Sequence, residues 1–172
     1  MTQLAQANVF RPRAAWGDAV MREFVLAVDP VNQLAEASPG FVWRLRPGEG
    51  HGAVVVPDEV SPVLVNLSVW ESYPYLHEFV YRSAHAGYLR RRSQWFAPVT
   101  QPAAVLWWVA DGEQPSADDA VARLRHLQRS GPSERAFDLR RRFEADGRPS
   151  PRRVGPRDRP PWRPADRRAG RA

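Results

Sequence analysis

One eight-residue segment, residues 63–70 (Val-Leu-Val-Asn-Leu-Ser-Val-Trp), constrains the fold of this chain more than any other. Within it, apolar side chains at positions 65, 67 and 69 alternate with Asn66, Ser68 and Trp70. Successive side chains of a β-strand point to opposite faces of a sheet, so the alternation predicts a strand with one apolar face and one polar–aromatic face. The fold must therefore give the two faces of one sheet different surroundings.

Periodic segments on either side of this strand predict an α+β fold. Further strands are expected at residues 3–10, 41–46 and 103–110, with a short edge strand at 53–56. Helices are expected at about residues 18–37, 73–95 and 117–130, with a kink or two abutting helices at Pro30, and an extended arm at 137–143. The order β-α-β-β-α-β is the ferredoxin-like plan, a four-stranded antiparallel sheet with both main helices on one face, here with an appended C-terminal helix.

A single layer of helices leaves the second face of such a sheet uncovered. The side chains expected on that face are too mixed for a dry core and too aromatic for water; they are Gln6, Asn8, Asn66, Ser68 and Trp70. Two sheets paired face to face would cover these residues and enclose a partly polar cavity. The sequence therefore predicts a homodimer, a dimeric α+β barrel.

Composition excludes several classes of protein. The chain has no Cys, which excludes disulfides, thiolate metal sites and Cys nucleophiles. No apolar stretch is long enough to cross a membrane, and the N-terminal residues lack the basic and apolar regions of a secretory signal. We therefore expect a cytoplasmic protein with no membrane partner.

The positive charge belongs to the C-terminus. The formal net charge is +6, yet twelve of the 25 basic residues lie in residues 140–172, beside only four acidic ones. The Arg/Pro-rich end has too little apolar surface to fold, so we expect a domain at residues 1–146 and a disordered tail at 147–172. The nearly neutral domain argues against specific nucleic-acid binding, whereas weak electrostatic binding by the tail stays open.

Five motifs, in one order along the chain, resemble the bacterial domain-of-unknown-function 3291 family. They are residues 29–32 (Asp-Pro-Val-Asn), 38–44 (Ser-Pro-Gly-Phe-Val-Trp-Arg), 65–71 (Val-Asn-Leu-Ser-Val-Trp-Glu), 79–85 (Phe-Val-Tyr-Arg-Ser-Ala-His) and 106–109 (Leu-Trp-Trp-Val). The resemblance runs from about Leu4 to Phe143, and the residues after Asp146 lie outside it.

This resemblance implies membership of the dimeric α+β barrel superfamily, which agrees with the fold expected from the residues themselves. That superfamily includes cofactor-free monooxygenases, small isomerases and cyclases, haem-degrading oxygenases, and haem enzymes such as chlorite dismutases. In several haem members a helix His ligates the iron. The family itself has no generally established activity, so the resemblance implies a fold rather than one reaction.

His85 is the first candidate for chemistry. If residues 73–95 form one helix, Tyr81, Tyr88 and Arg92 share a face with His85. That face would supply a general acid/base with a phenol partner and an anion clamp. Two alternatives stay open: His85 as the axial ligand of a haem with Arg92 beside a propionate, or His85 as a half-buried structural residue.

A lined pocket is expected as the second part of the site. Buried polar groups on a strand need partners, which a ligand or the dimer interface would supply. The candidate ligand-binding residues, besides Tyr88, are Asn8, Trp43, Asn66, Ser68, Trp70, Trp95 and Trp108. Sequence alone leaves open whether His85 and the two asparagines line one cavity or two.

The leading hypothesis is a cofactor-independent monooxygenase, isomerase or cyclase that acts on a hydrophobic or aromatic substrate, with His85 as acid/base. The first alternative is a haem-binding protein, and the second is a non-catalytic ligand-binding or interaction protein. The sequence has no zinc, dinucleotide, nucleotide or serine-hydrolase motif, so no metal is expected apart from the iron of a haem on His85.

Overall fold

The computed structural model describes residues 1–46, 54–56, 62–83 and 85–151. Its strands are β1 (Thr2–Phe10), β2 (Phe41–Arg44), β3 (Val54–Val56), β4 (Val63–Trp70) and β5 (Ala104–Ala110). Its α-helices are α1 (Arg22–Glu36), α2 (Tyr73–Arg82), α3 (His85–Arg91) and α4 (Ala117–Ser130), with short 3-10 turns at Ala19–Met21 and Arg92–Gln94. None of these helices is long and apolar enough to span a membrane.

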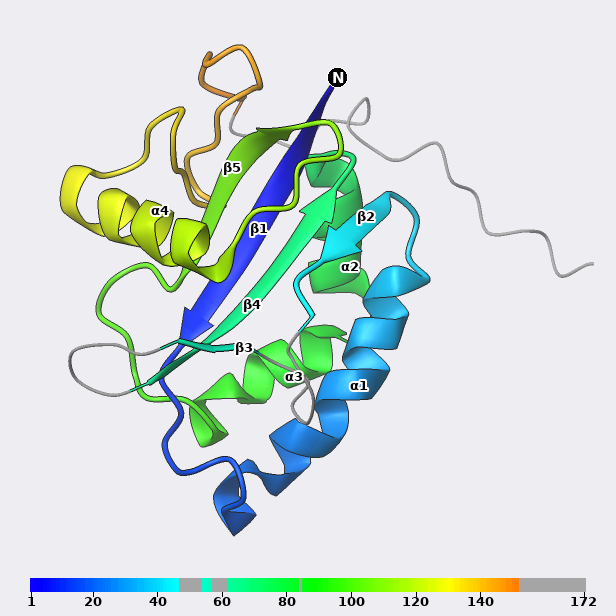
Figure 1. The fold of residues 1–172 in the computed structure, drawn as a ribbon, viewed down its shortest axis with the longest axis vertical. Coiled ribbons are helices and arrows are strands. Elements are labelled where there is room, and N and C mark those ends of the chain that lie inside the picture. Colours follow the sequence, from blue (N-terminus) through cyan, green and yellow to red (C-terminus); the bar gives the residue numbers. More distant parts are fainter. Residues whose placement is uncertain (47–53, 57–61, 84, 152–172) are drawn as a thin grey trace, which may run out of the picture.

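The strands form one antiparallel sheet in the order β2-β4-β1-β5, and β3 pairs with the other half of β4. The two strands that come first and last along the sheet-forming sequence, β1 and β5, therefore lie side by side, with β4 against the other edge of β1 (Figure 1). This arrangement confirms the ferredoxin-like α+β fold, with α4 as the appended helix.

Helices cover both faces of the sheet, one layer on each side (Figure 1). On one face α4 packs its Leu124 and Leu127 against an apolar cluster that includes Val65, Leu67 and Trp107. On the other face α1 and α2 pack against a cluster that contains Leu4, Trp70 and Leu106. The protein thus has three layers, and its core is divided by the sheet.

The prediction that the polar–aromatic face is uncovered is therefore wrong. That face, with Trp70 fully buried and Gln6 and Ser68 buried, lies beneath α1 and α2. The apolar face is the one that receives α4. The alternation in β4 correctly separates the residues of the two faces, but it carries no information on which helices cover each one.

The predicted single helix over residues 73–95 is also wrong, because α2 ends at Arg82 and Ser83 has an extended backbone (ψ −179°). The Ser83 hydroxyl donates to the carbonyl oxygen of Phe79 (2.5 Å) and accepts a hydrogen bond from the backbone N–H of His85 (3.1 Å). This side chain satisfies backbone groups at the end of one helix and the beginning of the next. In contrast, α1 continues through Pro30 as one helix.

The C-terminal arm returns to the sheet beside β5. Phe137 forms an antiparallel bridge with Leu106, with backbone hydrogen bonds of 2.8 and 2.9 Å in the two directions. Further along, the indole N–H of Trp108 donates to the carbonyl of Phe143 (2.8 Å), and Ser150 donates to the carbonyl of Arg142 (2.8 Å). The folded body extends in this way to Pro151, and residues 152–172 of the predicted tail lie outside the described residues.

Candidate functional site

A small cavity lies between the polar–aromatic face of the sheet and the helices α1, α2 and α3; we call it the helix–sheet cavity. Its volume is about 40 Å³. The polar side chains that line it are Gln6, Asn8, Asn32, Arg44, Asn66, Ser68 and His85. His85 and the two asparagines, which the sequence could not assign to one cavity or two, thus line the same one.

The floor of the cavity is a chain of hydrogen bonds between strands β1 and β4. Gln6 is the register partner of Ser68 in this antiparallel pair. The indole N–H of Trp70 donates to Ser68 Oγ (2.9 Å), and the Ser68 hydroxyl donates to Gln6 Oε1 at a long 3.5 Å. Buried polar atoms are costly without partners, so this chain explains how Gln6 and Ser68 are tolerated under two helices.

The open end of the cavity presents two amides. Asn8 and Asn66 are register partners one step further along the same strand pair, with Asn8 half-buried and Asn66 exposed. Within the part of the chain that the structure describes, neither side chain hydrogen bonds to another residue. Each amide offers two donors and a carbonyl acceptor, so the pair is able to bind a polar group that enters the cavity.

His85 is the first residue of α3, where the break between α2 and α3 turns it towards the cavity. Its Nδ1 lies 3.4 Å from the carbonyl oxygen of Val80, and its ring lies 5.0 Å from the ring of Phe79, centroid to centroid. Burial lowers the pKa of His85 below the ordinary value of 6.5, and the Val80 carbonyl opposes this shift in part. A neutral ring whose Nδ1–H donates to Val80 leaves Nε2 with a free lone pair.

The residues predicted to share a helix face with His85 do not share a site with it. The break at Ser83 separates Tyr81 from His85, whereas Tyr88 and Arg92 follow His85 after the break and contact other groups. Tyr81 is 43% exposed and packs on the ring of His77 (4.8 Å between centroids). Tyr88 packs beside Trp95 in a separate cluster, and the exposed Arg92 donates to the carbonyl of Leu89 (3.1 Å). None of the three predicted partners lines the helix–sheet cavity.

The four candidate tryptophans are dispersed rather than gathered around a ligand. Trp70 is fully buried and contacts the floor through Ser68. Trp43 packs against the cluster on the α4 face, Trp95 belongs to a cluster with Met21 and Phe96, and Trp108 is bound to the C-terminal arm. An aromatic clamp of these residues is not formed in this structure.

Asn32 is the functional candidate that the sequence reasoning missed. It lies on the inner side of α1 at 5% exposure and lines the cavity opposite the strand residues. Its position in an otherwise apolar helix stripe, between Val28 and Ala35, was the available signal, since a buried amide in such a stripe needs a polar partner. Arg44 was also missed; its Nε lies 2.7 Å from Glu36 Oε1, an oxygen that it shares with Arg46 (3.2 Å).

The helix–sheet cavity does not fit a haem. A volume of about 40 Å³ is far below that of pockets that hold ligands of drug size or larger, several hundred Å³. Arg92, the predicted partner of a propionate, lies outside the cavity. Among the residues with described positions, no group of three or more His, Asp or Glu side chains is placed to hold a metal ion.

The family model described as Domain of unknown function (DUF3291) matches residues 3–153. None of the curated proteins compared with the chain matches it. Its similarity to solved structures is low. One is Rv0793 from Mycobacterium tuberculosis, with 16% identity, a TM-score of 0.42, and 66% of this chain and 99% of that chain covered.

Two further solved structures are similar to the chain at the same level. The protein of unknown function NE2512 from Nitrosomonas europaea has 13% identity and a TM-score of 0.41 over 68% of this chain and 98% of that chain. A monooxygenase from the gene ActVA-Orf6 of Streptomyces coelicolor, solved with the ligand nanaomycin D, has 20% identity and a TM-score of 0.41 over 67% and 94% of the respective chains. Similarity at this level carries no conclusion about the reaction.

Proposed function

The chain belongs to the DUF3291 family, and we propose that it is a small-molecule enzyme that uses His85 as a general base in the helix–sheet cavity. The proposal covers cofactor-independent monooxygenases, isomerases and cyclases, because each begins by removing an acidic proton from its substrate. The observation that supports it best is the presence of one imidazole, with its pKa lowered by burial, in the same cavity as four amides and a hydroxyl.

The first step follows from the protonation state of His85. A ring whose pKa lies below 6.5 is mostly neutral at physiological pH and accepts a proton at Nε2. The proton comes from a C–H or O–H bond of the substrate, whose bonding electron pair stays on the substrate as an enolate or phenolate. The Val80 carbonyl, 3.4 Å from Nδ1, stabilises the imidazolium that results.

The negative charge that forms on the substrate oxygen needs donors that are already in place. Asn8, Asn66 and Asn32 line the cavity from three different elements, β1, β4 and α1, and Asn32 also has a partner within the protein. Donors that are held in position stabilise a developing anion without the cost of reorienting solvent. We assign this role to the three amides.

The cavity volume restricts the part of the substrate that reacts inside it. About 40 Å³ admits the polar end of a molecule, such as one carbonyl or phenol group, rather than a whole ring system. The apolar wall formed by Val31, Phe79 and Val80 would contact the carbon atoms beside that group. A hydrophobic or aromatic body would therefore lie towards the open end, near Asn66.

Catalysed proton exchange tests this proposal without knowledge of the natural substrate. The protein is incubated in D2O with a panel of enolisable dicarbonyl compounds and polyphenols, and deuterium incorporation is followed by NMR. His85→Gln keeps a polar side chain of similar size but cannot act as the base, so exchange should fall by about 10²- to 10⁴-fold. His126→Gln is the matched control, because His126 lies on α4 and contacts Ser133 (3.3 Å) on the other face of the sheet.

Equal exchange by the wild type and His85→Gln would exclude His85 as the base. Binding of a panel compound with no exchange at all would instead favour the second candidate function, a non-catalytic ligand-binding protein. One observation favours that alternative: Tyr81 and Arg92, the expected catalytic partners of His85, lie outside the cavity.

The homodimer stays a prediction, but the sheet face that was expected to form its interface is covered by helices. The face with Asn66, Ser68 and Trp70 is occupied by α1 and α2, so a second sheet could not pack there without displacing these helices. Light scattering at micromolar concentration tests the oligomeric state; a dimer should scatter as twice the 19.5 kDa chain.

A further inference from the structure

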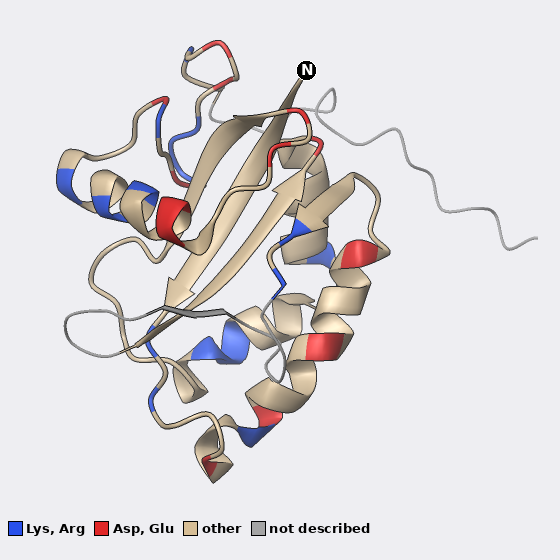
Figure 2. Ribbon diagram, in the orientation of Figure 1, with Lys and Arg blue, Asp and Glu red and all other residues tan. Residues whose placement is uncertain are grey.

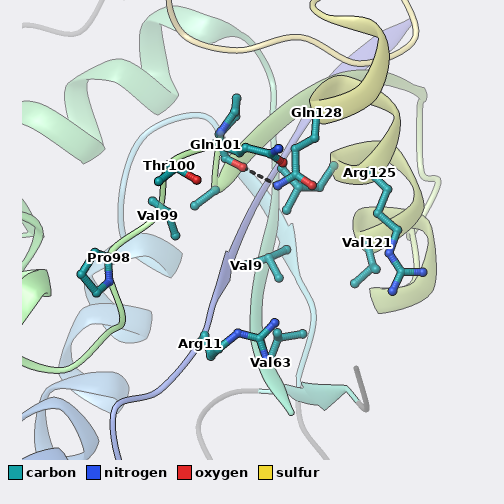
Figure 3. A pocket seen from close by; sticks show the side chains of 13 residues that line it. Val9, Arg11, Val63, Pro98, Val99, Thr100, Gln101, Val121, Arg125 and Gln128 are labelled. Atoms are coloured by element: carbon teal, nitrogen blue, oxygen red, sulfur yellow. Dashed lines mark hydrogen bonds between the residues drawn. The ribbon is translucent and has the colours of Figure 1, made fainter. Parts of the chain in front are cut away.

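A second, larger pocket lies on the other face of the sheet from the helix–sheet cavity; we call it the α4 groove. It is bounded by α4, by the ends of β1 and β4, and by residues 98–103, the segment that leads into β5 (Figure 3). Its volume is about 300 Å³, at the lower end of the range typical of small-molecule sites. Nothing in the reaction proposed for His85 uses this groove.

The inner surface of the groove is apolar. Val9 and Val63 line it from the sheet, and Val121 and Leu124 line it from α4. At the rim, Val99 is 56% exposed. Val63 (7% exposed) and Leu124 (6% exposed) are already buried, so the apolar surface that a ligand would cover belongs mainly to Val9, Val99 and Val121. Its burial would be favourable by about 25 cal/mol per Å² of apolar surface removed from water.

The charged residues that line the groove, within the described part of the chain, are all basic. The thirteen lining residues, all within the described part of the chain, include Arg11 and Arg125 and no Asp or Glu. In Figure 3, Arg11 lies beside Val63 and Arg125 runs along α4 beside Val121, with Gln101 and Gln128 towards the top of the view. Both Arg residues already have an interaction within the protein. A guanidinium has five N–H donors, so such an interaction does not exhaust its capacity to bind an anion.

Basic residues also extend beyond the groove along α4. Figure 2 shows them spaced over the later turns of that helix, whereas acidic residues mark its first turn. Arg125 and Arg129, four residues apart, share one side of the helix, whereas Arg123 lies on the opposite side, where it packs on the ring of Trp107 (5.3 Å) and donates to the carbonyl of Arg135 (2.6 Å). The electrostatic potential near the groove would therefore attract anions and repel cations.

Residues 98–103, which form the wall of the groove opposite α4, are held in place by hydrogen bonds at both ends and in the middle. The N–H of Ala97 donates to the carbonyl of Arg11 (2.9 Å) at one end of the segment, and the N–H of Val9 donates to the carbonyl of Ala103 (2.8 Å) at the other. Between them, the Gln128 side-chain amide donates to the carbonyl of Pro102 (2.8 Å), the bond drawn in Figure 3. Pro98 and Pro102 further restrict the backbone, so the groove exists without a ligand.

We propose that the α4 groove is a binding site for an amphipathic organic anion, namely a carboxylate with a compact apolar body. The carboxylate lies at the end of the groove that contains Arg11 and Arg125. The apolar body lies on Val9, Val63, Val121 and Leu124. This site is separate from the helix–sheet cavity, and its occupancy does not depend on the chemistry of His85.

Three probes that differ only in their head group test the proposal: octanoate, octan-1-ol and octylamine. Isothermal titration calorimetry with the full chain should show octanoate as the tightest and octylamine as the weakest. Arg11→Gln and Arg125→Gln should each weaken octanoate binding about ten-fold or more, the effect of one lost charge-assisted hydrogen bond. Arg129→Gln, on the same helix but outside the groove, should change it little.

A fourth variant keeps the test independent of damage to the fold. Val99→Asp places a negative charge at the exposed rim, where substitution is well tolerated, and it should weaken octanoate binding but not octylamine binding. Equal affinity for octanoate and octan-1-ol, or no binding of octanoate, would overturn the proposal. So would loss of octanoate binding in His85→Gln with no loss in the two Arg variants, because the ligand would then occupy the helix–sheet cavity.

Discussion

Substitution of Gly40 tests quantitatively how closely α2 packs against the start of β2. It precedes β2 with φ +72°, and a Cβ at this position would overlap Cβ and the ring of Tyr75 on α2. Gly112, with φ +79°, has the same type of backbone conformation, and no atom lies within 4 Å of the position that a Cβ would occupy there. The two glycines therefore differ in steric surroundings and not in backbone strain.

The expected effects of Ala substitution can be separated accordingly. The left-handed backbone costs an L-residue about 1–2 kcal/mol, and Gly112→Ala should lose only this much stability. Gly40→Ala should lose the same amount plus about 1–3 kcal/mol for overpacking against Tyr75, or about 2–5 kcal/mol together. For a chain of this size each kcal/mol lowers the Tm by roughly 2–4 °C, so calorimetry or urea denaturation should resolve the two variants.

A double variant shows whether Tyr75 is the cause. When Gly40→Ala is combined with Tyr75→Ala, the overlap disappears. The loss of stability in this double variant should therefore be smaller than the sum of the losses in the two single variants. The reasoning is refuted if Gly40→Ala and Gly112→Ala are equally stable. The outcome also concerns the candidate site, because α2 carries Phe79 and Val80, which line the helix–sheet cavity.

Three further predictions follow from the site and the tail. Because the folded-state pKa of His85 lies below its unfolded value of 6.5, the wild type should lose stability as pH falls through 6.5, and chemical denaturation at pH 7.5 and 5.5 should show a smaller loss for His85→Gln. Trp70→Phe should lower the free energy of unfolding by roughly 1–3 kcal/mol through the lost hydrogen bond to Ser68, in addition to the effect of the cavity it leaves. Adding Ser68→Ala should recover part of that loss, because the unpaired hydroxyl is then removed; if the effects of the two substitutions simply add, the assigned bond is contradicted. Removal of residues 152–172 should change the Tm by no more than about 2 °C, because the segment has little apolar surface to bury, and a larger shift would mean that it docks on the body.

The sequence by itself determined those features that depend on local pattern. The alternation in residues 63–70 identified β4 and separated Val65 and Leu67 from Asn66 and Ser68, because strand geometry alone places them on opposite faces. The capping box at the start of α4 was readable from Ser116 and Asp119, whose reciprocal hydrogen bonds involve only near neighbours. The order of elements then limited the topology to the ferredoxin-like arrangement.

Only the tertiary structure decided which helices cover each face and which residues form the site. The assignment of α1 and α2 to the polar–aromatic face depends on packing between segments far apart in the chain, which no local period encodes. The chain leaves the helical conformation at Ser83, within a segment that the hydrophobic pattern predicts as one helix, and this break separates His85 from Tyr81. It brings His85 to Asn32 and Asn66 instead, because residues meet across a cavity through the packing of whole elements and not through their spacing in sequence.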